Sequence, residues 1–238
     1  MNPSTSLPSA PPSETSQGKI VVITGATGAL GILTAKTFAE MGASLALLDN
    51  DQNRLDSLIS DLNLPEDRLF ASVVDLRDGG AVRDSAEAVS NKFGAVHALI
   101  HLVGGWTGGK TIAETPIDDL EGMLGQHVWT TFHLFQAFSP KLAASGWGRV
   151  ITISPSTVSN PLPERGVYTA SKAAQENLML TLAAELKESG VTANIIQVRA
   201  IDVENKGTGA TPDVIVATMQ YLFSDQAGKV NGARIPLY

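Results

Sequence analysis

Short runs of aliphatic residues alternate along the chain with longer segments whose apolar positions recur every three or four residues. A continuous apolar run is typical of a strand buried on both faces, and three- to four-residue spacing is typical of an amphipathic helix. The expected strands span residues 21–24, 44–48, 69–74, 96–103, 148–154, 191–198 and 233–237. The expected helices span residues 30–41, 78–93, 116–142, 165–189 and 211–223, and another begins near residue 52.

Regular alternation of strand and helix predicts an α/β fold, in which a doubly wound parallel sheet carries helices on both faces. We see no internal repeat or linker, and 238 residues with 43% hydrophobic content suit a single domain. Ligands of such folds bind beyond the carboxyl ends of the strands. The residues expected at that edge are 24–31, Asp49, Asp75 and 104–105.

Composition narrows the possible partners and compartment. The net charge of −7 disfavours nucleic acid as a partner, and no long uncharged run predicts a membrane span. The absence of cysteine excludes disulfides, thiolate metal sites and a thiol nucleophile, and it suits a cytoplasmic location; no metal site is expected. Residues 1–17 are rich in Ser and Pro and lack the pattern of a signal peptide, so we expect a disordered tail before one domain over residues 18–238.

The first strand leads into a glycine-rich turn, Thr24–Gly31, and then into a helix. The glycines let the backbone turn sharply and approach a ligand closely. The free N–H groups at the start of the helix, together with its dipole, favour a pyrophosphate. Because such a turn can also be purely structural, the rest of the chain has to decide between the two interpretations.

Asp49 ends the second strand, eighteen residues after Gly31. In a doubly wound fold, an acid at this place meets the adenosine ribose of a dinucleotide. Its carboxylate would accept both ribose hydroxyls and repel a 2′-phosphate, so the residue favours NAD and makes NADP less likely; the nearest cation is Arg54. Alternatively, Asp49 caps the helix that begins near Gln52.

Tyr168 and Lys172 lie four residues apart at the start of a long expected helix, and therefore share one helix face. A cation beside a phenol stabilises the phenolate and lowers the phenol pKa. A tyrosine of this kind can donate a proton to a carbonyl.

Together these motifs resemble the short-chain dehydrogenase/reductase family. Thr24–Gly31 is similar to its TGxxxGxG cofactor loop, Asp75-Leu76 to its adenine-pocket acid, and Tyr168 to Lys172 to its YxxxK pair. The resemblance implies a Rossmann-type sheet of about seven strands and hydride transfer with a nicotinamide cofactor. Tyr168 would be the acid/base and Lys172 would hold the nicotinamide ribose. The cofactor-binding residues expected on this basis are Gly25, Thr27, Gly28, Ala29, Leu30, Gly31, Asp49, Asp75, Leu76, Gly104, Tyr168 and Lys172.

The chain departs from the family pattern around the expected substrate. Pro155 stands where the family has a serine that stabilises the carbonyl oxygen, and we consider Ser156 as its replacement. His127 aligns with the family's asparagine, as either a plain hydrogen-bonding residue or a proton donor and substrate contact. Arg199 replaces the usual glycine after the sixth strand, and residues 202–210 form only a short substrate lid.

Two segments, 104–109 and 126–130, resemble the dihydropteridine reductase branch of the family, which lacks the serine and uses NADH to reduce a quinonoid pterin. Trp106 would stack on such a ring, and we expect Trp129 to be a packing residue. Members of the family commonly form homodimers or homotetramers through the two long helices.

Two hypotheses follow. The first is an NAD(H)-dependent oxidoreductase acting on a carbonyl or conjugated imine, with Tyr168, Lys172, Ser156 and His127 as catalytic residues. The alternative is a catalytically impaired dinucleotide-binding protein with a sensory or scaffolding role.

Overall fold

Seven parallel strands pair in the order β3-β2-β1-β4-β5-β6-β7, so the strand order reverses between β1 and β4. The computed structural model describes residues 17–238; the predicted tail over residues 1–17 falls almost entirely outside this range. The strands are β1 (Ile20–Thr24), β2 (Ser44–Asp49), β3 (Leu69–Val73), β4 (Ala98–His101), β5 (Gly148–Pro155), β6 (Val191–Val198) and β7 (Arg234–Pro236). The expected Rossmann-type sheet of about seven strands is confirmed.

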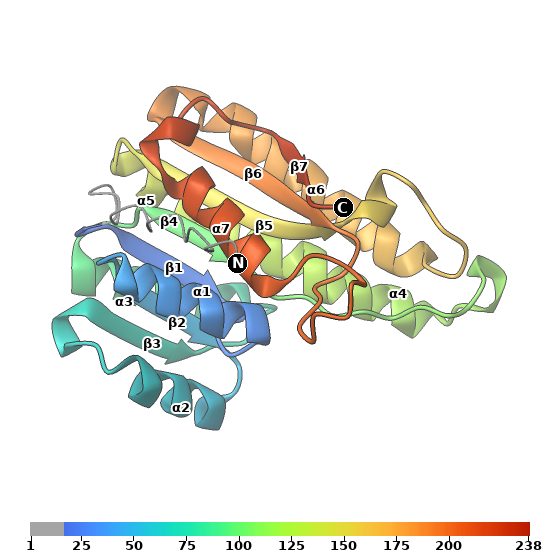
Figure 1. Cartoon of the computed structure of the whole chain (residues 1–238), viewed down its shortest axis with the longest axis horizontal. Coiled ribbons are helices and arrows are strands. Elements are labelled where there is room, and N and C mark those ends of the chain that lie inside the picture. Colours follow the sequence, from blue (N-terminus) through green and yellow to red (C-terminus); the bar gives the residue numbers. More distant parts are fainter. Residues whose placement is uncertain (1–16) are drawn as a thin grey trace, which may run out of the picture.

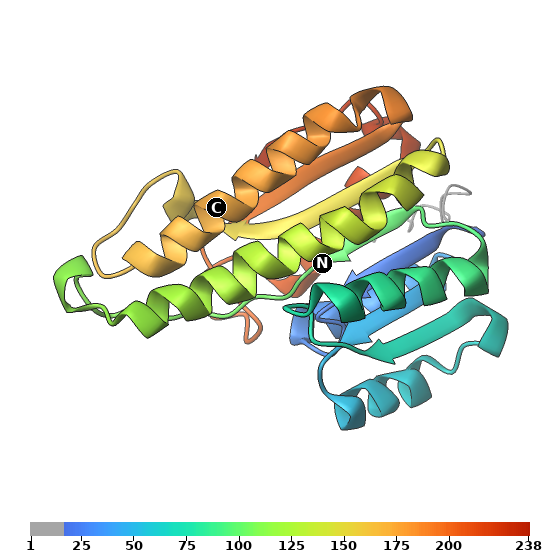
Figure 2. The ribbon, with the colours of Figure 1, turned by 180° about the vertical axis from the view of Figure 1, so that it is seen from behind.

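The helices form a layer on each face of the sheet. They are α1 (Ala29–Glu40), α2 (Gln52–Leu62), α3 (Gly79–Phe93), α4 (Ile117–Leu124), α5 (Thr130–Ala144), α6 (Gly166–Glu185) and α7 (Pro212–Phe223). Helices α1, α2 and α7 cover one face (Figure 1). Helices α3, α5 and α6 cover the other, as the view from behind shows (Figure 2).

The two helix layers explain why the central strands contain runs of consecutive apolar residues. All five residues of β1 and all eight of β6 are buried. Alternate apolar side chains of strands β1 to β6 enter two separate apolar clusters, one beneath each helix layer. A strand covered on both faces has no solvent side and can carry consecutive apolar residues, as in 21–23 of β1 and 45–48 of β2.

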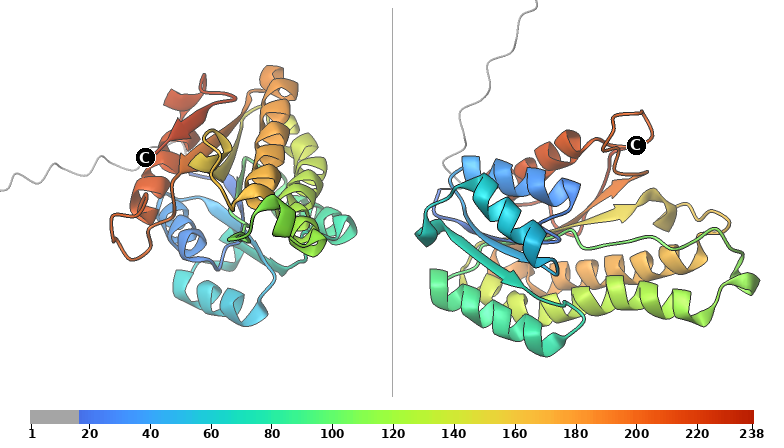
Figure 3. Two further views of the ribbon diagram at one scale, coloured as in Figure 1. Left: turned by 90° about the vertical axis from the view of Figure 1, so that its right-hand side faces the viewer. Right: turned by 90° about the horizontal axis from the view of Figure 1, so that it is seen from below.

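The helix expected over residues 116–142 is interrupted. A π-helical turn, Gly125–Trp129, joins α4 to α5. Such turns often occur at functional sites, and apolar periodicity does not reveal a single extra residue in one turn. The α4–α5 rod and α6 run side by side and extend past the carboxyl edge of the sheet (Figure 3).

The link between β6 and α7 is short, as expected. An isolated bridge joins Ile201 to Ala210 and closes a loop. The buried Asp202 carboxylate accepts hydrogen bonds from the backbone N–H groups of Lys206 and Thr208, at 2.9 and 3.0 Å. The Asp202 carboxylate therefore holds the backbone of this loop in place.

Candidate active site

Two cavities lie at the carboxyl edge of the sheet. The first, which we call the Asp49 cavity, has a volume of about 610 Å³, and the second, the Tyr168 cavity, about 400 Å³. Both are lined by the glycine-rich turn and by the residues after β4. The shared lining residues are Gly25, Gly28, Leu102, Val103 and Gly104. The two cavities therefore meet over the turn between β1 and α1.

The turn can exist only with glycine at two of its positions. Gly25 has a φ of +69°, and a side chain there would also approach the backbone of Leu102 at 3.1 Å. A Cβ on Gly31 would lie 2.2 Å from the carbonyl oxygen of Gly25. Within residues 17–238, no side chain caps the start of α1 at Gly28, so the first N–H groups of that helix are available to a ligand.

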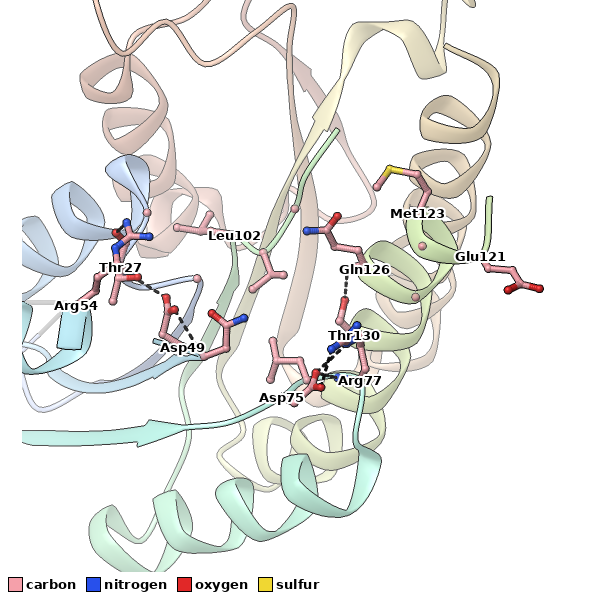
Figure 4. A pocket seen from close by; sticks show the side chains of 18 residues that line it. Thr27, Asp49, Arg54, Asp75, Arg77, Leu102, Glu121, Met123, Gln126 and Thr130 are labelled. Atoms are coloured by element: carbon pink, nitrogen blue, oxygen red, sulfur yellow. Dashed lines mark hydrogen bonds and ion pairs between the residues drawn. The ribbon is translucent and has the colours of Figure 1, made fainter. Parts of the chain in front are cut away.

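The Asp49 carboxylate is positioned by the same turn (Figure 4). It accepts hydrogen bonds from the N–H groups of Thr27 and Asn50, both at 2.9 Å. Arg54 lies beside it and donates to the carbonyl oxygen of Thr27. The alternative role for Asp49 as a helix cap is wrong, because the residue that caps α2 is Asp51.

Asp75 lies across the Asp49 cavity from Asp49 and pairs with Arg77, whose Nε and Nη2 donate to the carboxylate at 3.0 and 2.9 Å (Figure 4). The hydrogen bonds from Arg77 lower the pKa of Asp75. Leu76 also lines this cavity. The Asp49 cavity is thus lined by two carboxylates, each with an arginine beside it.

Tyr168 and Lys172 come from the first turns of α6 and line the Tyr168 cavity together. Burial raises the pKa of Tyr168, and Arg165 acts in the opposite direction. This differs from the expected lowering by Lys172. Burial lowers the pKa of Lys172 itself to about 8, against an opposing effect of Glu176.

Lys172 is held by two acceptors. Its Nζ donates to the carbonyl oxygen of Ile153 at 3.1 Å and to Oε1 of Gln175 at 2.9 Å. An ammonium has three N–H donors. The described residues therefore leave one donor for a ligand in the Tyr168 cavity.

His127 lies behind the cavity wall and does not line either cavity. The backbone N–H of Gly105 donates to its Nε2 at 3.3 Å, so Nδ1 carries the proton and donates to Ser171 Oγ at 2.9 Å. Ser171 in turn donates to the carbonyl oxygen of Tyr168 at 2.8 Å. Burial lowers the pKa of His127 to about 3. These positions correct the idea of His127 as a proton donor: its neutral ring connects the π-helical turn to α6.

Pro155 lines the Tyr168 cavity and supplies neither a hydroxyl nor an N–H. Ser156 begins the next 3₁₀ turn and is not among the lining residues, so the structure does not bring it to the cavity as expected. Ser154 does line the cavity, but its Oγ is buried and has no hydrogen-bond partner among the described residues. His101 also has a buried polar atom without a partner. Its Nδ1 is hydrogen-bonded to Thr24 Oγ1 at 2.7 Å, while its buried Nε2 has no hydrogen-bond partner among the described residues.

Trp106 and Arg199 lie at the mouth of the Tyr168 cavity. Trp106 is 55% exposed, and the Arg165 guanidinium lies 6.0 Å from the centre of its ring. Arg199 forms no ion pair with any residue in the described range. Trp129, expected to pack, is instead 55% exposed.

Sequence reasoning missed Gln175 and Arg77. Gln175 follows Lys172 by three residues, a spacing that places both on one helix face and that would have identified it. Arg77 follows Asp75 by two residues in a loop, where no periodicity applies. Two negative findings apply to residues 17–238: no helix is both long and apolar enough to span a membrane, and no cluster of three potential metal ligands occurs.

The donor set fits a nicotinamide dinucleotide. A helix start with free N–H groups lies between the cavities, where it would receive a pyrophosphate. Carboxylates that can accept from ribose hydroxyls lie on one side. A phenol and an ammonium with a spare donor lie on the other.

Comparisons with known proteins agree with this geometry. The family model described as short chain dehydrogenase matches residues 19–211. The chain is 27% identical over 189 residues to 2,3-dihydroxy-2,3-dihydro-p-cumate dehydrogenase of Pseudomonas putida, covering 79% of this chain and 73% of the relative. It is 28% identical to 7alpha-hydroxysteroid dehydrogenase of Escherichia coli, over 86% of this chain and 79% of the relative.

Among solved structures, the chain is similar to an NADPH-bound short chain oxidoreductase of Pseudomonas aeruginosa that is described as containing an atypical catalytic center. The two align with a TM-score of 0.85 at 25% identity, over 93% of this chain and 96% of that one. A 3-ketoacyl-(acyl-carrier-protein) reductase of Brucella melitensis, solved with NADH, shares the fold at 21% identity, with a TM-score of 0.85 over 93% and 97% of the chains. The chain therefore belongs to the short-chain dehydrogenase/reductase family of oxidoreductases.

Proposed function

We propose that this protein is an NAD(H)-dependent oxidoreductase that reduces a carbonyl or a conjugated imine. The observation that carries the proposal is the continuous site from the Asp49 cavity, over the uncapped start of α1, to Tyr168 and Lys172. A nicotinamide dinucleotide bound there would supply the hydride. The residues of the chain then have to orient both reactants and deliver a proton.

Tyr168 is the proton donor in this proposal. Burial, which raises the pKa of the phenol, keeps Tyr168 protonated at neutral pH and so ready to donate in the reductive direction. Lys172 lines the same cavity and has one N–H left after its bonds to Ile153 and Gln175, which would hold a ribose hydroxyl of the cofactor. His127, through Ser171, fixes the first turn of α6 that carries Tyr168.

The substrate we propose is an electron-poor acceptor. Among the described residues that line the Tyr168 cavity, only Ser154 and Tyr168 carry hydroxyls, and the Ser154 oxygen is buried. Losing one donor to the substrate oxygen typically costs about 3 kcal/mol of transition-state stabilisation, a factor of about 10²–10³ in rate. A conjugated ring such as a quinonoid dihydropterin needs less polarisation, and the exposed Trp106 offers a surface for stacking.

For the cofactor we propose NADH in preference to NADPH. The Asp49 carboxylate stands at the end of β2 and would repel a 2′-phosphate. Arg54 and Arg77 line the same cavity, but Arg54 bonds the turn and Arg77 is paired with Asp75. Similar folds have been solved with either cofactor, so the preference rests on Asp49.

A dinucleotide-binding protein without turnover is the second candidate, and Pro155 in place of a donor is the observation that favours it. NADH consumption with quinones, quinonoid dihydropterin and diketones separates the two. The oxidoreductase proposal predicts oxidation above background with at least one class. NADH binding without any oxidation would leave the sensory or scaffolding role.

We also propose a homodimer or homotetramer assembled through the α4–α5 rod and α6. Phe132 on α5 is 42% exposed, and Trp129, at the end of the π-helical turn before it, is 55% exposed, so this surface offers apolar area to a partner copy. A monomeric mass in light scattering would refute this assembly. The compartment we propose is the cytosol, on the cysteine-free composition.

A further inference from the structure

The orientation of the Gln175 side chain is determined by its neighbours on α5. Thr131 Oγ1 donates its only proton to the carbonyl oxygen of His127, at 2.6 Å. It can therefore only accept from Gln175, which lies 2.8 Å away, so the amide nitrogen of Gln175 must face Thr131. Its oxygen, Oε1, is left facing Lys172 at 2.9 Å.

This chain of hydrogen bonds is enclosed. Thr131 and Gln175 have no exposed surface, and Lys172 is only 6% exposed. Gln175 Nε2 also approaches the carbonyl oxygen of His127, at 3.4 Å. The π-helical turn is thereby connected to the ammonium of Lys172 through one carboxamide.

Among the described residues, the other groups around Lys172 do not provide a second side-chain acceptor of this kind. His101 on β4 and His127 on the π-helical turn are both buried and neutral, because burial and the charge of Lys172 lower each pKa to about 3. Tyr168 lies one turn before Lys172 on α6. Glu176, the acid whose charge acts to raise the Lys172 pKa, accepts hydrogen bonds from Arg234 of β7 at 2.5 Å and from Gln197 at 2.9 Å.

We propose that Gln175 is the positioning residue of the catalytic lysine: it holds the Lys172 ammonium against Ile153 so that the third N–H faces the Tyr168 cavity. The proposal rests on the function proposed above for Lys172. Gln175 does not touch substrate or cofactor; it acts by accepting a hydrogen bond from the charged form of Lys172. An acceptor of this kind stabilises the ammonium form of the lysine, whereas burial favours the neutral amine.

Two substitutions at this position should move the Lys172 pKa in opposite directions. Gln175→Leu removes the acceptor and should lower the pKa below its present value of about 8. Gln175→Glu places a carboxylate against the ammonium and should raise the pKa by about 1–3 pH units. Gln226→Glu is the matched control, because it adds the same charge at an exposed position in the turn after α7.

The pKa of Lys172 is measured directly, in the protein without added cofactor, from the pH titration of its ¹³Cε NMR signal, assigned by its disappearance in Lys172→Met. Opposite shifts in the two variants, with no shift in Gln226→Glu, support the proposal. Unchanged values, or shifts in the same direction, overturn it and leave Gln175 as a packing residue. If one of the two Gln175 variants does not fold, the direction of the Lys172 pKa shift in the other variant supports or overturns the proposal.

NADH titrations across pH give a second measurement. The pH above which NADH affinity falls should move up in Gln175→Glu and down in Gln175→Leu. If wild type neither binds nor oxidises NADH while the NMR shifts are opposite, the positioning role of Gln175 stands and the proposed function fails. The two failures are therefore distinguishable.

Discussion

Gly31→Ala is the change that tests the geometry of the glycine-rich turn most severely. The added Cβ would lie 2.2 Å from the carbonyl oxygen of Gly25 and 2.7 Å from that of Ala26, well inside an ordinary contact distance of about 3.5 Å. Both neighbours are backbone atoms in the turn itself, so neither can rotate away. We expect a loss of about 3 kcal/mol in the free energy of unfolding, at the upper end of overpacking costs.

Gly28→Ala is the matched control in the same turn. Gly28 has a φ of −70°, and its added Cβ would lie 3.4 Å from the carbonyl oxygen of Gly25, an ordinary contact. The gain from restricting the unfolded chain and the loss at a helix N-cap are each about 0.5–1 kcal/mol and oppose each other. Stability should therefore change little. Because Gly28 lines both cavities, however, NADH affinity should fall about tenfold or more.

Thermal unfolding and NADH fluorescence titration measure the two effects separately. For a chain of this size, about 2–4 °C of Tm corresponds to each kcal/mol, so Gly31→Ala should lower Tm by about 6–12 °C. Gly28→Ala should stay within about 3 °C of wild type. An unchanged Tm for Gly31→Ala would refute the turn geometry. An unchanged NADH Kd for Gly28→Ala would refute the placement of the pyrophosphate over the turn.

Three further predictions concern the residues around the two cavities. The pKa of His101 in the folded protein is about 3, below its ordinary value of about 6.5. Its neutral form therefore contributes stability above about pH 6.5. This stability is lost as the pH falls toward 3, by about 1.4 kcal/mol per pH unit. Urea unfolding between pH 7 and 4.5 should therefore show a shallower loss for His101→Asn, and equal slopes would contradict the burial of a neutral ring. Asp49→Ala should shift the ratio of NADPH to NADH affinity about tenfold or more toward NADPH, measured by fluorescence titration; an unchanged ratio removes Asp49 from cofactor selection. Pro155→Ser should raise kcat/KM for an unactivated ketone by up to about 10² while changing that for a quinonoid acceptor less, and equal gains for both acceptors would argue against a missing donor.

The sheet could be predicted from the sequence because burial on both faces leaves a strong signal in every central strand. The positions of Asp49 and Asp75 could be predicted as well. Both residues come at strand ends, and the carboxyl ends of parallel strands share one edge of the sheet. The π-helical turn could not be predicted, since one extra residue in a turn leaves the apolar pattern of the helix nearly unchanged.

Substrate-side residues were harder to predict because a single side chain's direction depends on its neighbours in space. Ser156 and Ser154 flank Pro155 in sequence, and only the structure shows that Ser154 lines the cavity with a buried oxygen. His127 aligns with a functional position, yet hydrogen bonds from Gly105 and to Ser171 occupy both ring nitrogens. Neither fact is encoded in spacing.

The central claim, that Tyr168 protonates a substrate beside a bound nicotinamide, is tested most directly by comparing wild type with Tyr168→Phe. NADH Kd is measured by fluorescence, and NADH consumption is followed at 340 nm with quinonoid dihydropterin and quinones. We predict consumption by wild type, and in the variant a fall of about 10²–10⁴ in kcat with a nearly unchanged Kd. Full activity in Tyr168→Phe would contradict the claim.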